Sequence, residues 1–358
     1  MEFLESSPST SNVIQYLTAD LSDKQLQTFD KTYIKKIHRD LTPERIECLI
    51  ISRNLFEVIP LDVFKFVNLR RLEVCELSLR VIPEEITTLS HLRHLDIRNN
   101  CLQTIPKFLS KLGMLNEINI SGNEISTFPE VLFELNHLNT LHLGDNRLEI
   151  IPRHIDKIKK LKVLYLGGNR LAEIPDTIGA LRQLTCLVLC DNQLTTLPQS
   201  LAGLQNLQRL SLHNNLIRTL PPQIIKLENL HSLSLRNNPL VRKFVDDMAF
   251  SPPSLMEIAG RAVRKNIPCN QINHILPSAL ITYLNSAHEC VNPHCGGVYF
   301  EARFEHIKFV DFCGMYKVPL LQYLCSPKCG CGCSDNGPHV VGCHNRLTDA
   351  RMKKVLLG

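Results

Sequence analysis

A repeated motif is clearest in Leu138–Pro152, which reads Leu-Asn-Thr-Leu-His-Leu-Gly-Asp-Asn-Arg-Leu-Glu-Ile-Ile-Pro. The same arrangement of leucine, asparagine, isoleucine and proline returns 23 residues later in Leu161–Pro175. Eight leucines open successive units at this spacing, and a ninth, weaker unit opens at Ile46. The eight leucines are Leu69, Leu92, Leu115, Leu138, Leu161, Leu184, Leu207 and Leu230. A constant period of this length predicts a solenoid of nine stacked units, because one unit alone cannot bury its apolar face.

The position of each residue within the unit explains its type. Leu141 and Leu143 lie two residues apart, so a strand points both side chains toward the same core. The asparagine that follows, Asn146 in this unit, carries a short amide that can bond the backbone of its own and neighbouring turns. Pro152 fixes φ and lacks an amide donor after the turn. Leu77 replaces the asparagine in the second unit, and a local defect is expected there.

The pattern over residues 46–240 resembles the leucine-rich repeat family. This resemblance implies an α/β solenoid of about nine 23-residue repeats, whose concave face is lined by the strands and commonly binds a partner. We expect the solenoid to occupy residues 46–250. Residues 1–45 are expected to form an N-terminal helical cap that includes a basic amphipathic helix over Asp30–Asp40.

Composition and charge exclude several classes of protein. The chain has 358 residues with 40 Lys+Arg and 35 Asp+Glu, and this small basic excess argues against a nucleic-acid-binding protein. No apolar run approaches the ~18 residues of a membrane span, and Met1–Asp20 lacks the pattern of a signal peptide. The 14 cysteines are therefore expected to be free thiols or metal ligands in a cytoplasmic protein, with the nucleus as a second compartment.

The strand residues that point away from the core form the candidate concave surface. Acidic side chains dominate its early units, small or weakly apolar ones its middle, and Arg209, His213 and Arg236 its late units. Such a distribution suits a protein partner, and the alternative is a merely solvated face. Catalysis is not expected, because no nucleophile accompanies His142 and Asp145, and Cys186 and Cys190 are interpreted as small residues rather than metal ligands. The candidate contact residues are Asp96, Arg98, Asn119, His142, Tyr165, Val188, His213 and Arg236.

Two helices are predicted after the repeats, at residues 251–287. Ser254 and Glu257 form a capping-box pattern at the start of the first helix. An apolar stripe follows at helical spacing, and it consists of Leu255, Ile258, Ala259, Ala262 and Val263. Pro277 suits the first turn of the second helix, on which Leu280 and Leu284 share a face.

Residues 253–284 resemble a suppressor-of-cytokine-signalling box, also called a von Hippel–Lindau box in its cullin 2 form. The resemblance implies that Leu255, Ala259 and Val263 bind elongin C, although Ala259 stands where the family usually has cysteine. It further implies that a second element binds the cullin, through Leu276, Pro277, Leu280 and Leu284. Ser278 and Ala279 depart from the cullin 5 pattern, which favours cullin 2. The alternative is that the first helix merely caps the solenoid.

A cysteine-rich region follows at residues 288–330. Cys290 and Cys295 have four residues between them, and Cys325 and Cys329 have three, which is within or near the spacing of zinc knuckles. Four thiolates favour a closed, structural zinc site rather than a catalytic one with an open position. Alternative ligands are Cys313, His288 and His294. Residues 331–358 are expected to form a flexible tail that binds no metal.

Three functions remain open from the sequence. The first is a non-catalytic substrate receptor that joins a target protein to elongin B, elongin C and cullin 2 or cullin 5 for ubiquitination. The second is a signalling scaffold for a protein such as a small GTPase, and the third is a zinc-dependent enzyme or nucleic-acid binder. The first two differ in whether the Leu255 stripe is exposed or covered by the solenoid. The chain also resembles one particular leucine-rich repeat-containing protein over nearly its whole length. The stretches that carry this resemblance lie outside the repeat and include Asn292–Phe300 and Ile307–Gly314.

Overall fold

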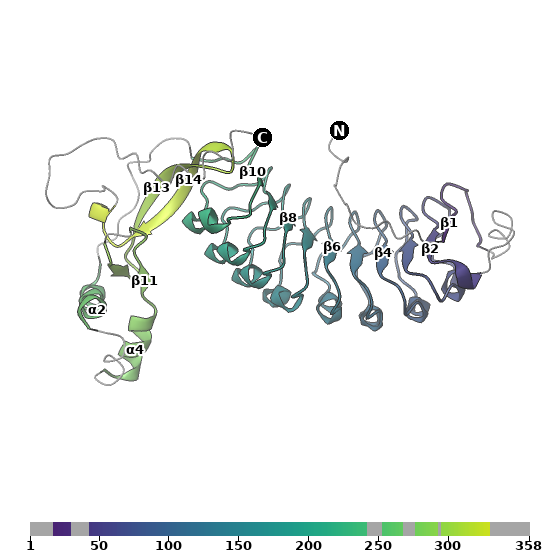
Figure 1. The fold of residues 1–358 in the computed structure, drawn as a ribbon, viewed down its shortest axis with the longest axis horizontal. Helices are drawn as coiled ribbons and strands as arrows, with labels where there is room; N and C mark the ends of the chain where they lie inside the picture. Colours follow the sequence, from purple (N-terminus) through teal and green to yellow (C-terminus); the bar gives the residue numbers. More distant parts are fainter. Residues whose placement is uncertain (1–16, 30–42, 242–252, 268–275, 293–294, 330–358) are drawn as a thin grey trace.

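The computed structural model describes residues 17–29, 43–241, 253–267, 276–292 and 295–329. Figure 1 shows a long solenoid of stacked turns with a smaller module at its C-terminal end. The strands of the solenoid run side by side along one face, and short helical turns line the opposite face.

Ten short strands form one parallel sheet, in the order of the sequence. Each strand from β2 to β9 pairs with the strand 23 residues further on, as Leu141 pairs with Leu164. The repeat period therefore sets the register directly. The strands are β1 (Thr18–Asp20), β2 (Cys48–Ile50), β3 (Arg71–Glu73), β4 (His94–Asp96), β5 (Glu117–Asn119), β6 (Thr140–His142), β7 (Val163–Tyr165), β8 (Cys186–Val188), β9 (Arg209–Ser211) and β10 (Ser232–Ser234).

The sheet begins one strand earlier than the repeat predicts. Thr18 pairs with Cys48, so β1 extends the sheet from within the region expected to be a helical cap. Residues 17–29 also contribute Leu21 and Leu26 to the solenoid core. The described part of this region is therefore the first turn of the solenoid. The helix expected over Asp30–Asp40 lies outside the described residues.

The face opposite the strands is built from 3₁₀ turns, so the repeats differ from the expected α/β units. In a typical repeat the 3₁₀ turn is only five residues long and directly follows the proline, as Arg153–Lys157 follows Pro152. The Ile155 amide donates to the Pro152 carbonyl at 3.1 Å, which is the i to i+3 bond of a 3₁₀ turn. α-Helices appear only after the repeats in the described chain. The turns are η1 (Pro43–Arg45), η2 (Leu61–Lys65), η3 (Glu84–Thr88), η4 (Lys107–Lys111), η5 (Glu130–Glu134), η6 (Arg153–Lys157), η7 (Asp176–Ala180), η8 (Gln199–Gly203) and η9 (Pro222–Lys226).

A ladder of buried asparagines binds each repeat to the one before it. The Asn169 amide donates to the carbonyls of Leu143, at 2.9 Å, and Leu166, at 3.0 Å, while its oxygen accepts from the Leu148 amide at 3.0 Å. These bonds satisfy backbone groups that the turn leaves without partners. The buried Leu77 occupies the asparagine position in its repeat, so the ladder is interrupted there as expected.

The terminal module contains two helices, two short strands and a long hairpin. Val318 and Leu320 of the hairpin belong to the solenoid core, and the Leu220 amide donates to the Pro319 carbonyl at 2.9 Å. The hairpin, rather than either helix, thus closes the end of the solenoid. The elements are α2 (Leu255–Asn266), α4 (Ser278–Asn285), β11 (His288–Glu289), β12 (Val298–Tyr299), β13 (Phe304–Phe312), β14 (Met315–Leu324) and η10 (Pro327–Cys329).

Candidate functional site

The outer face of α2 is an exposed apolar stripe. Leu255 is 85% exposed, and Met256 and Ile258 are each 51% exposed. Ala259 and Ala262 are exposed beside them. No described residue covers this stripe, because the hairpin has taken the place of a solenoid cap. Val263, the last residue of the predicted stripe, is half-buried against the apolar cluster formed by Leu284 and Phe300, defined here as the module core.

The inner face of α2 packs closely on two aromatic rings. A Cβ on Gly260 would lie 3.1 Å from the rings of Phe300 and Tyr283, so glycine brings the helix backbone against them. These two rings stack on each other with centroids 4.4 Å apart and planes inclined by 8°. The sequence pattern did not single out Gly260, because a glycine within a helix carries no signal of its contacts.

Glu257 is a buried anchor of α2. Ser254 caps the helix by accepting from the Glu257 amide at 3.2 Å, as the capping box predicts. The Glu257 carboxylate, however, turns inward and accepts from the amides of Phe300, at 3.1 Å, and Ala302, at 2.8 Å. Burial opposes ionisation of this carboxyl, but the bonds from the Ala302 amide and Arg261 outweigh it and lower its pKa.

Arg261 joins α2 to the cysteine region. Its guanidinium pairs with Glu257 and donates to the carbonyl of Cys325 at 2.7 Å. It also donates to the carbonyl of Ala302. Three separate segments therefore meet at one side chain, and the outward stripe of α2 is held by contacts on its opposite face.

The predicted cullin contacts divide into two pairs. Pro277 is exposed and Leu280 is 39% exposed, so both remain available to a partner. Leu276 is half-buried against the module core, and Leu284 is only 4% exposed within it. The prediction for Leu284 is therefore corrected: this side chain fixes α4 to Phe300 rather than facing outward.

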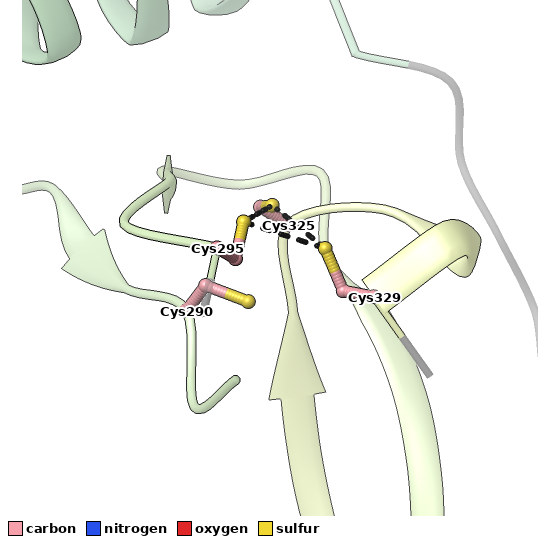
Figure 2. A group of neighbouring side chains, drawn as sticks. All are labelled: Cys290, Cys295, Cys325 and Cys329. Atoms are coloured by element: carbon pink, nitrogen blue, oxygen red, sulfur yellow. Dashed lines mark hydrogen bonds between the residues drawn. The ribbon is translucent and has the colours of Figure 1, made fainter. Parts of the chain in front are cut away.

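The structure brings the four predicted cysteines together at the end of the hairpin furthest from the solenoid (Figure 2). The Sγ atoms of Cys295 and Cys325 lie 3.3 Å apart, and those of Cys325 and Cys329 lie 3.5 Å apart. Cys290 completes the group, with all four sulfurs within 4.8 Å of one another. A disulfide requires about 2.05 Å, whereas four thiolates around zinc at ~2.3 Å lie about 3.8 Å apart. The spacing is close to that of a tetrahedral thiolate site.

The backbone around the cysteines leaves room for all four sulfurs. A Cβ on Gly297 would lie 2.9 Å from the Cys295 sulfur and 3.0 Å from that of Cys325, so only glycine fits. Burial raises the pKa of Cys290 and of Cys325. Burial acts in the same direction on Cys329, but bonds from the Ser326 hydroxyl and the neighbouring thiols lower its pKa overall. Cys329 is therefore the cysteine whose ionised form its neighbours stabilise, whereas burial stabilises the neutral thiols of Cys290 and Cys325.

The alternative ligands do not join this group within the described chain. Cys313 lies at the solenoid end, where its thiol donates to the Leu230 carbonyl at 3.6 Å. His288 stacks on Tyr299 with ring centroids 5.6 Å apart. His294, like the tail at residues 331–358, lies outside the described residues.

The concave surface carries all eight predicted contact residues, none of them fully buried. At its centre the rings of His142 and Tyr165 stack with centroids 4.4 Å apart. Burial lowers the pKa of His142, so its neutral form is favoured. A flat, half-buried aromatic pair with a polar edge is typical of the anchoring residues of protein interfaces.

The N-terminal end of this surface is less acidic than its composition suggests. Arg71 bonds Glu73 at 2.6 Å, His94 bonds Glu117 at 3.1 Å, and Asp96 approaches Arg98 at 3.8 Å. The carboxylates are therefore paired in place. A hollow of about 220 Å³ beside them is lined mainly by polar side chains and is smaller than the usual pocket for an organic ligand.

None of the described helices has both the length and the apolar character that a membrane-spanning helix needs.

Comparisons with known proteins agree with the solenoid. The family model "Leucine rich repeat" matches residues 67–125, 115–171 and 182–240. Together with the ten-stranded parallel sheet, these matches give the chain a leucine-rich repeat solenoid fold. The ectodomain of the plant receptor kinase GASSHO1/SCHENGEN3 from Arabidopsis thaliana is similar at 32% identity and a TM-score of 0.50. That similarity covers 55% of this chain and 24% of the receptor chain.

Relatives from several vertebrates carry the name leucine-rich repeat-containing protein 58. The one from Xenopus laevis is 45% identical over 123 residues, which is 34% of this chain and 35% of the relative. The human one is 50% identical over 91 residues, which is 25% of this chain and 24% of the relative. The sequence predicted a resemblance over nearly the whole chain, whereas these matches span about a third of each chain or less.

Proposed function

We propose that this protein is a non-catalytic substrate receptor of an elongin BC–cullin–RING ubiquitin ligase. The observation that carries the proposal is the exposed stripe of α2, whose opposite face is fixed in the terminal module. A helix held rigidly with leucine outward loses little conformational freedom when a partner covers it. The scaffold alternative required this stripe to be covered by the solenoid, and no described residue covers it.

In this proposal elongin C binds α2 through the exposed Leu255 and Ala259, which lie one turn apart, while Val263 one turn further packs partly on the module core and would border the contact. Ile258 and Ala262 border this line. Leu255 is the anchor, because burying a leucine side chain contributes about 1.5–3 kcal/mol. Ala259 occupies the position of the family's cysteine and is similarly small, so the approach of the partner helix is preserved.

The cullin would bind beside it, through the exposed Pro277 and Leu280 of α4. Cullin 2 is favoured over cullin 5, because Ser278 and Ala279 depart from the cullin 5 pattern. Leu276 and Leu284 would support this contact indirectly, because they fix α4 to the module core.

The cofactor in the proposal is one structural zinc ion, held by Cys290, Cys295, Cys325 and Cys329. The donor set, the sulfur spacing and the clearance at Gly297 support it. Such an ion would fasten η10 to the β11–β12 ribbon. Because Arg261 bonds the Cys325 carbonyl, the zinc site would also stiffen the support of α2.

The solenoid would hold the target protein on its concave face, with the His142–Tyr165 pair at the centre of the contact. Transfer of ubiquitin would then follow from proximity, because the target is held near a charged conjugating enzyme. No residue of this chain needs to form or break a bond.

The deciding experiment co-expresses the full chain with elongins B and C and measures complex formation by size-exclusion chromatography. Leu255→Asp is compared with Leu61→Asp, which places the same charge at a leucine that is 60% exposed on η2 of the solenoid. We expect Leu255→Asp to weaken binding by about 30-fold or more, since hot-spot residues contribute about 2 kcal/mol or more. Leu61→Asp should bind normally. A folded wild-type chain that forms no complex, or equal binding by both variants, would refute the proposal and favour the scaffold.

A further inference from the structure

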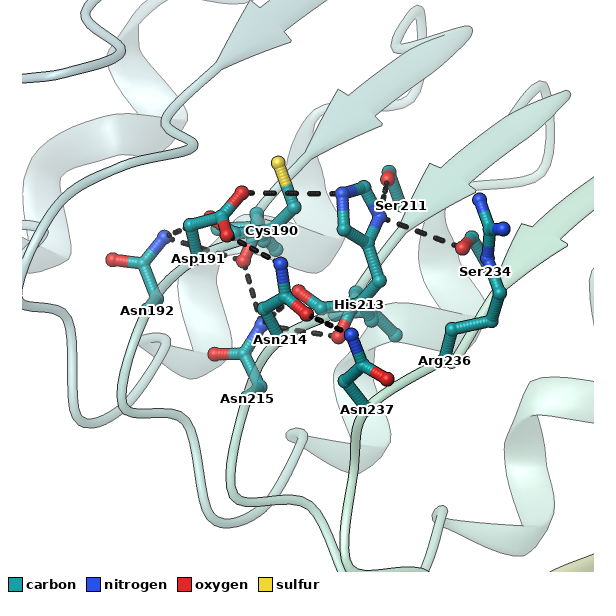
Figure 3. A network of polar contacts seen from close by, with 12 residues as sticks. Cys190, Asp191, Asn192, Ser211, His213, Asn214, Asn215, Ser234, Arg236 and Asn237 are labelled. Atoms are coloured by element: carbon teal, nitrogen blue, oxygen red, sulfur yellow. Dashed lines mark hydrogen bonds and ion pairs between the residues drawn. The ribbon is translucent and has the colours of Figure 1, made fainter. Parts of the chain in front are cut away.

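We propose a second metal site, on the concave face, in which Cys190, Asp191 and His213 bind a zinc-like divalent cation and leave one coordination position open. It goes beyond the ligase proposal and is independent of the cysteine group at the end of the hairpin. Figure 3 shows the three side chains near the C-terminal end of the solenoid sheet. Their candidate ligand atoms lie within 4.8 Å of one another.

The repeat register brings the three ligands together. Val188 pairs with Ser211 at the ends of β8 and β9, so Cys190 and His213, two residues beyond those ends, are neighbours on adjacent repeats. Asp191 follows Cys190 directly. A thiolate, an imidazole and a carboxylate bind zinc at ~2.0–2.3 Å, so small side-chain rotations would close the present group around an ion.

The imidazole of His213 is oriented with one nitrogen available. Its Nδ1 lies 2.9 Å from the Ser211 hydroxyl and 3.4 Å from that of Ser234. Its Nε2 points toward the Asp191 carboxylate at 3.9 Å (Figure 3). Metal-binding histidines are commonly held in this way, with the second nitrogen bonded to an oxygen that fixes the ring.

Asp191 is oriented by the next two repeats. Asn214 donates to Oδ1 of Asp191 at 2.6 Å, and Asn237 donates to the Asn214 oxygen at 2.6 Å. This chain of amides occupies one carboxylate oxygen and leaves Oδ2 facing His213. Each oxygen atom of Asp191 therefore has a separate partner, as in a supported ligand.

Space for the sulfur of Cys190 is provided by the preceding repeat. A Cβ on Gly167 would lie 2.8 Å from this sulfur, so a larger residue there would displace the thiol. In Figure 3 the side chain of Arg236 lies beside Ser234, on the opposite side of the His213 ring from Cys190 and Asp191. The face toward the proposed ion carries the carboxylate, while the arginine lies away from it.

The ligand set predicts the chemistry of the site. One sulfur and one imidazole nitrogen favour zinc and similar transition ions over Mg²⁺ or Ca²⁺, which prefer oxygen. Binding would release the thiol proton to solvent. Three protein ligands leave a position for water or for a side chain of a docked protein, so contact on this part of the concave face would become metal-dependent.

The test uses the full chain, first equilibrated with zinc and dialysed, and then titrated with Co²⁺. We expect one further equivalent of cobalt, with ligand-field bands in the visible and a sulfur-to-cobalt charge-transfer band. Zinc added afterwards should abolish these bands. Cys190→Ser should lose the charge-transfer band, and His213→Ala should reduce cobalt affinity at least 10-fold. Cys186→Ser is the matched control, a cysteine on neighbouring β8 that is outside the group, and it should behave as wild type.

Two results would overturn the inference. One is a wild-type chain that holds a single zinc ion after dialysis and binds no cobalt. The other is an identical spectrum in Cys190→Ser and Cys186→Ser. Cys325→Ser separates the two sites, because it should alter the hairpin site and leave the concave-face bands unchanged. Circular dichroism of each variant confirms that the solenoid is folded.

Discussion

Glu257 and Arg261 lie one turn apart on α2, and their ion pair is almost enclosed: the side chains are 2% and 19% exposed. The pair does more than stabilise the helix, because Arg261 continues to the Cys325 carbonyl. The helix, the ribbon and the cysteine group are therefore parts of one contact network.

Replacing Glu257 by glutamine should loosen α2 from the module. The change removes the charge that Arg261 pairs with, and breaking a buried pair costs about 3–5 kcal/mol. We expect faster hydrogen exchange across residues 253–267 and unchanged exchange in the solenoid, measured by mass spectrometry. Glu301→Gln, which alters an exposed glutamate next to Phe300, is the control. Equal exchange in both variants would mean that the pair does not hold the helix.

Removing zinc from the cysteine group should also loosen the contact between α2 and the terminal module. Wild-type protein is expected to retain one tightly held zinc through dialysis, measured by atomic absorption, and Cys325→Ser should lose it. Exchange should rise in residues 288–329 and in α2 on chelation, because an apo site no longer fastens η10 to the ribbon. Cys101→Ser, on the solenoid, should keep the ion. Retention of the ion by Cys325→Ser would contradict the assignment.

Replacing Asn169 by alanine should destabilise the solenoid. The change leaves the Leu148 amide and the Leu143 carbonyl without their side-chain partner, and each buried polar group left unsatisfied costs about 1–3 kcal/mol. Urea denaturation should show a lower midpoint. Asn136→Ala, at an exposed position, should change the free energy of unfolding by less than about 0.5 kcal/mol. Similar midpoints for the two variants would show that the ladder contributes little.

His142 should titrate below its ordinary pKa of about 6.5. Burial favours its neutral form, so the unfolded chain binds the proton more readily than the folded one. The stability that His142 contributes is complete above pH 6.5 and declines as the pH falls below it. NMR titration of the imidazole measures the midpoint, and Tyr165→Ala should raise it by uncovering the ring. A wild-type midpoint at or above 6.5 would contradict this expectation.

Much of the fold could be predicted because the repeat is local and uniform. Spacing alone places Leu141 in a strand, Leu143 in the core beside it and Asn146 in the ladder, as the structure has them. The meeting of Cys290 and Cys295 with Cys325 and Cys329 could also be predicted, because paired cysteines at knuckle spacing are distinctive.

The rest depended on contacts that no local pattern records. Thr18 pairs with Cys48 across 30 residues instead of 23, so the first strand falls outside the period. The sequence predicted Glu257 as part of a helix cap and Leu284 as an exposed contact. Both instead contact Phe300, which is too distant in the sequence for a local pattern to include it. Hairpin residues Val318 and Leu320 complete a core whose other members end 80 or more residues earlier.

Because the register of the sheet is constant, the number of repeats sets the length of the solenoid. Each unit lengthens the solenoid by one strand spacing, about 4.8 Å. Internal units contact their neighbours through the same strand pairing and, in most repeats, the same asparagine bonds. Deleting residues 161–183 would therefore shorten the arm by one step while leaving β1 at one end and the hairpin at the other. The distance between whatever the concave face holds and whatever α2 binds can be lengthened or shortened over generations in whole units, without redesigning either end.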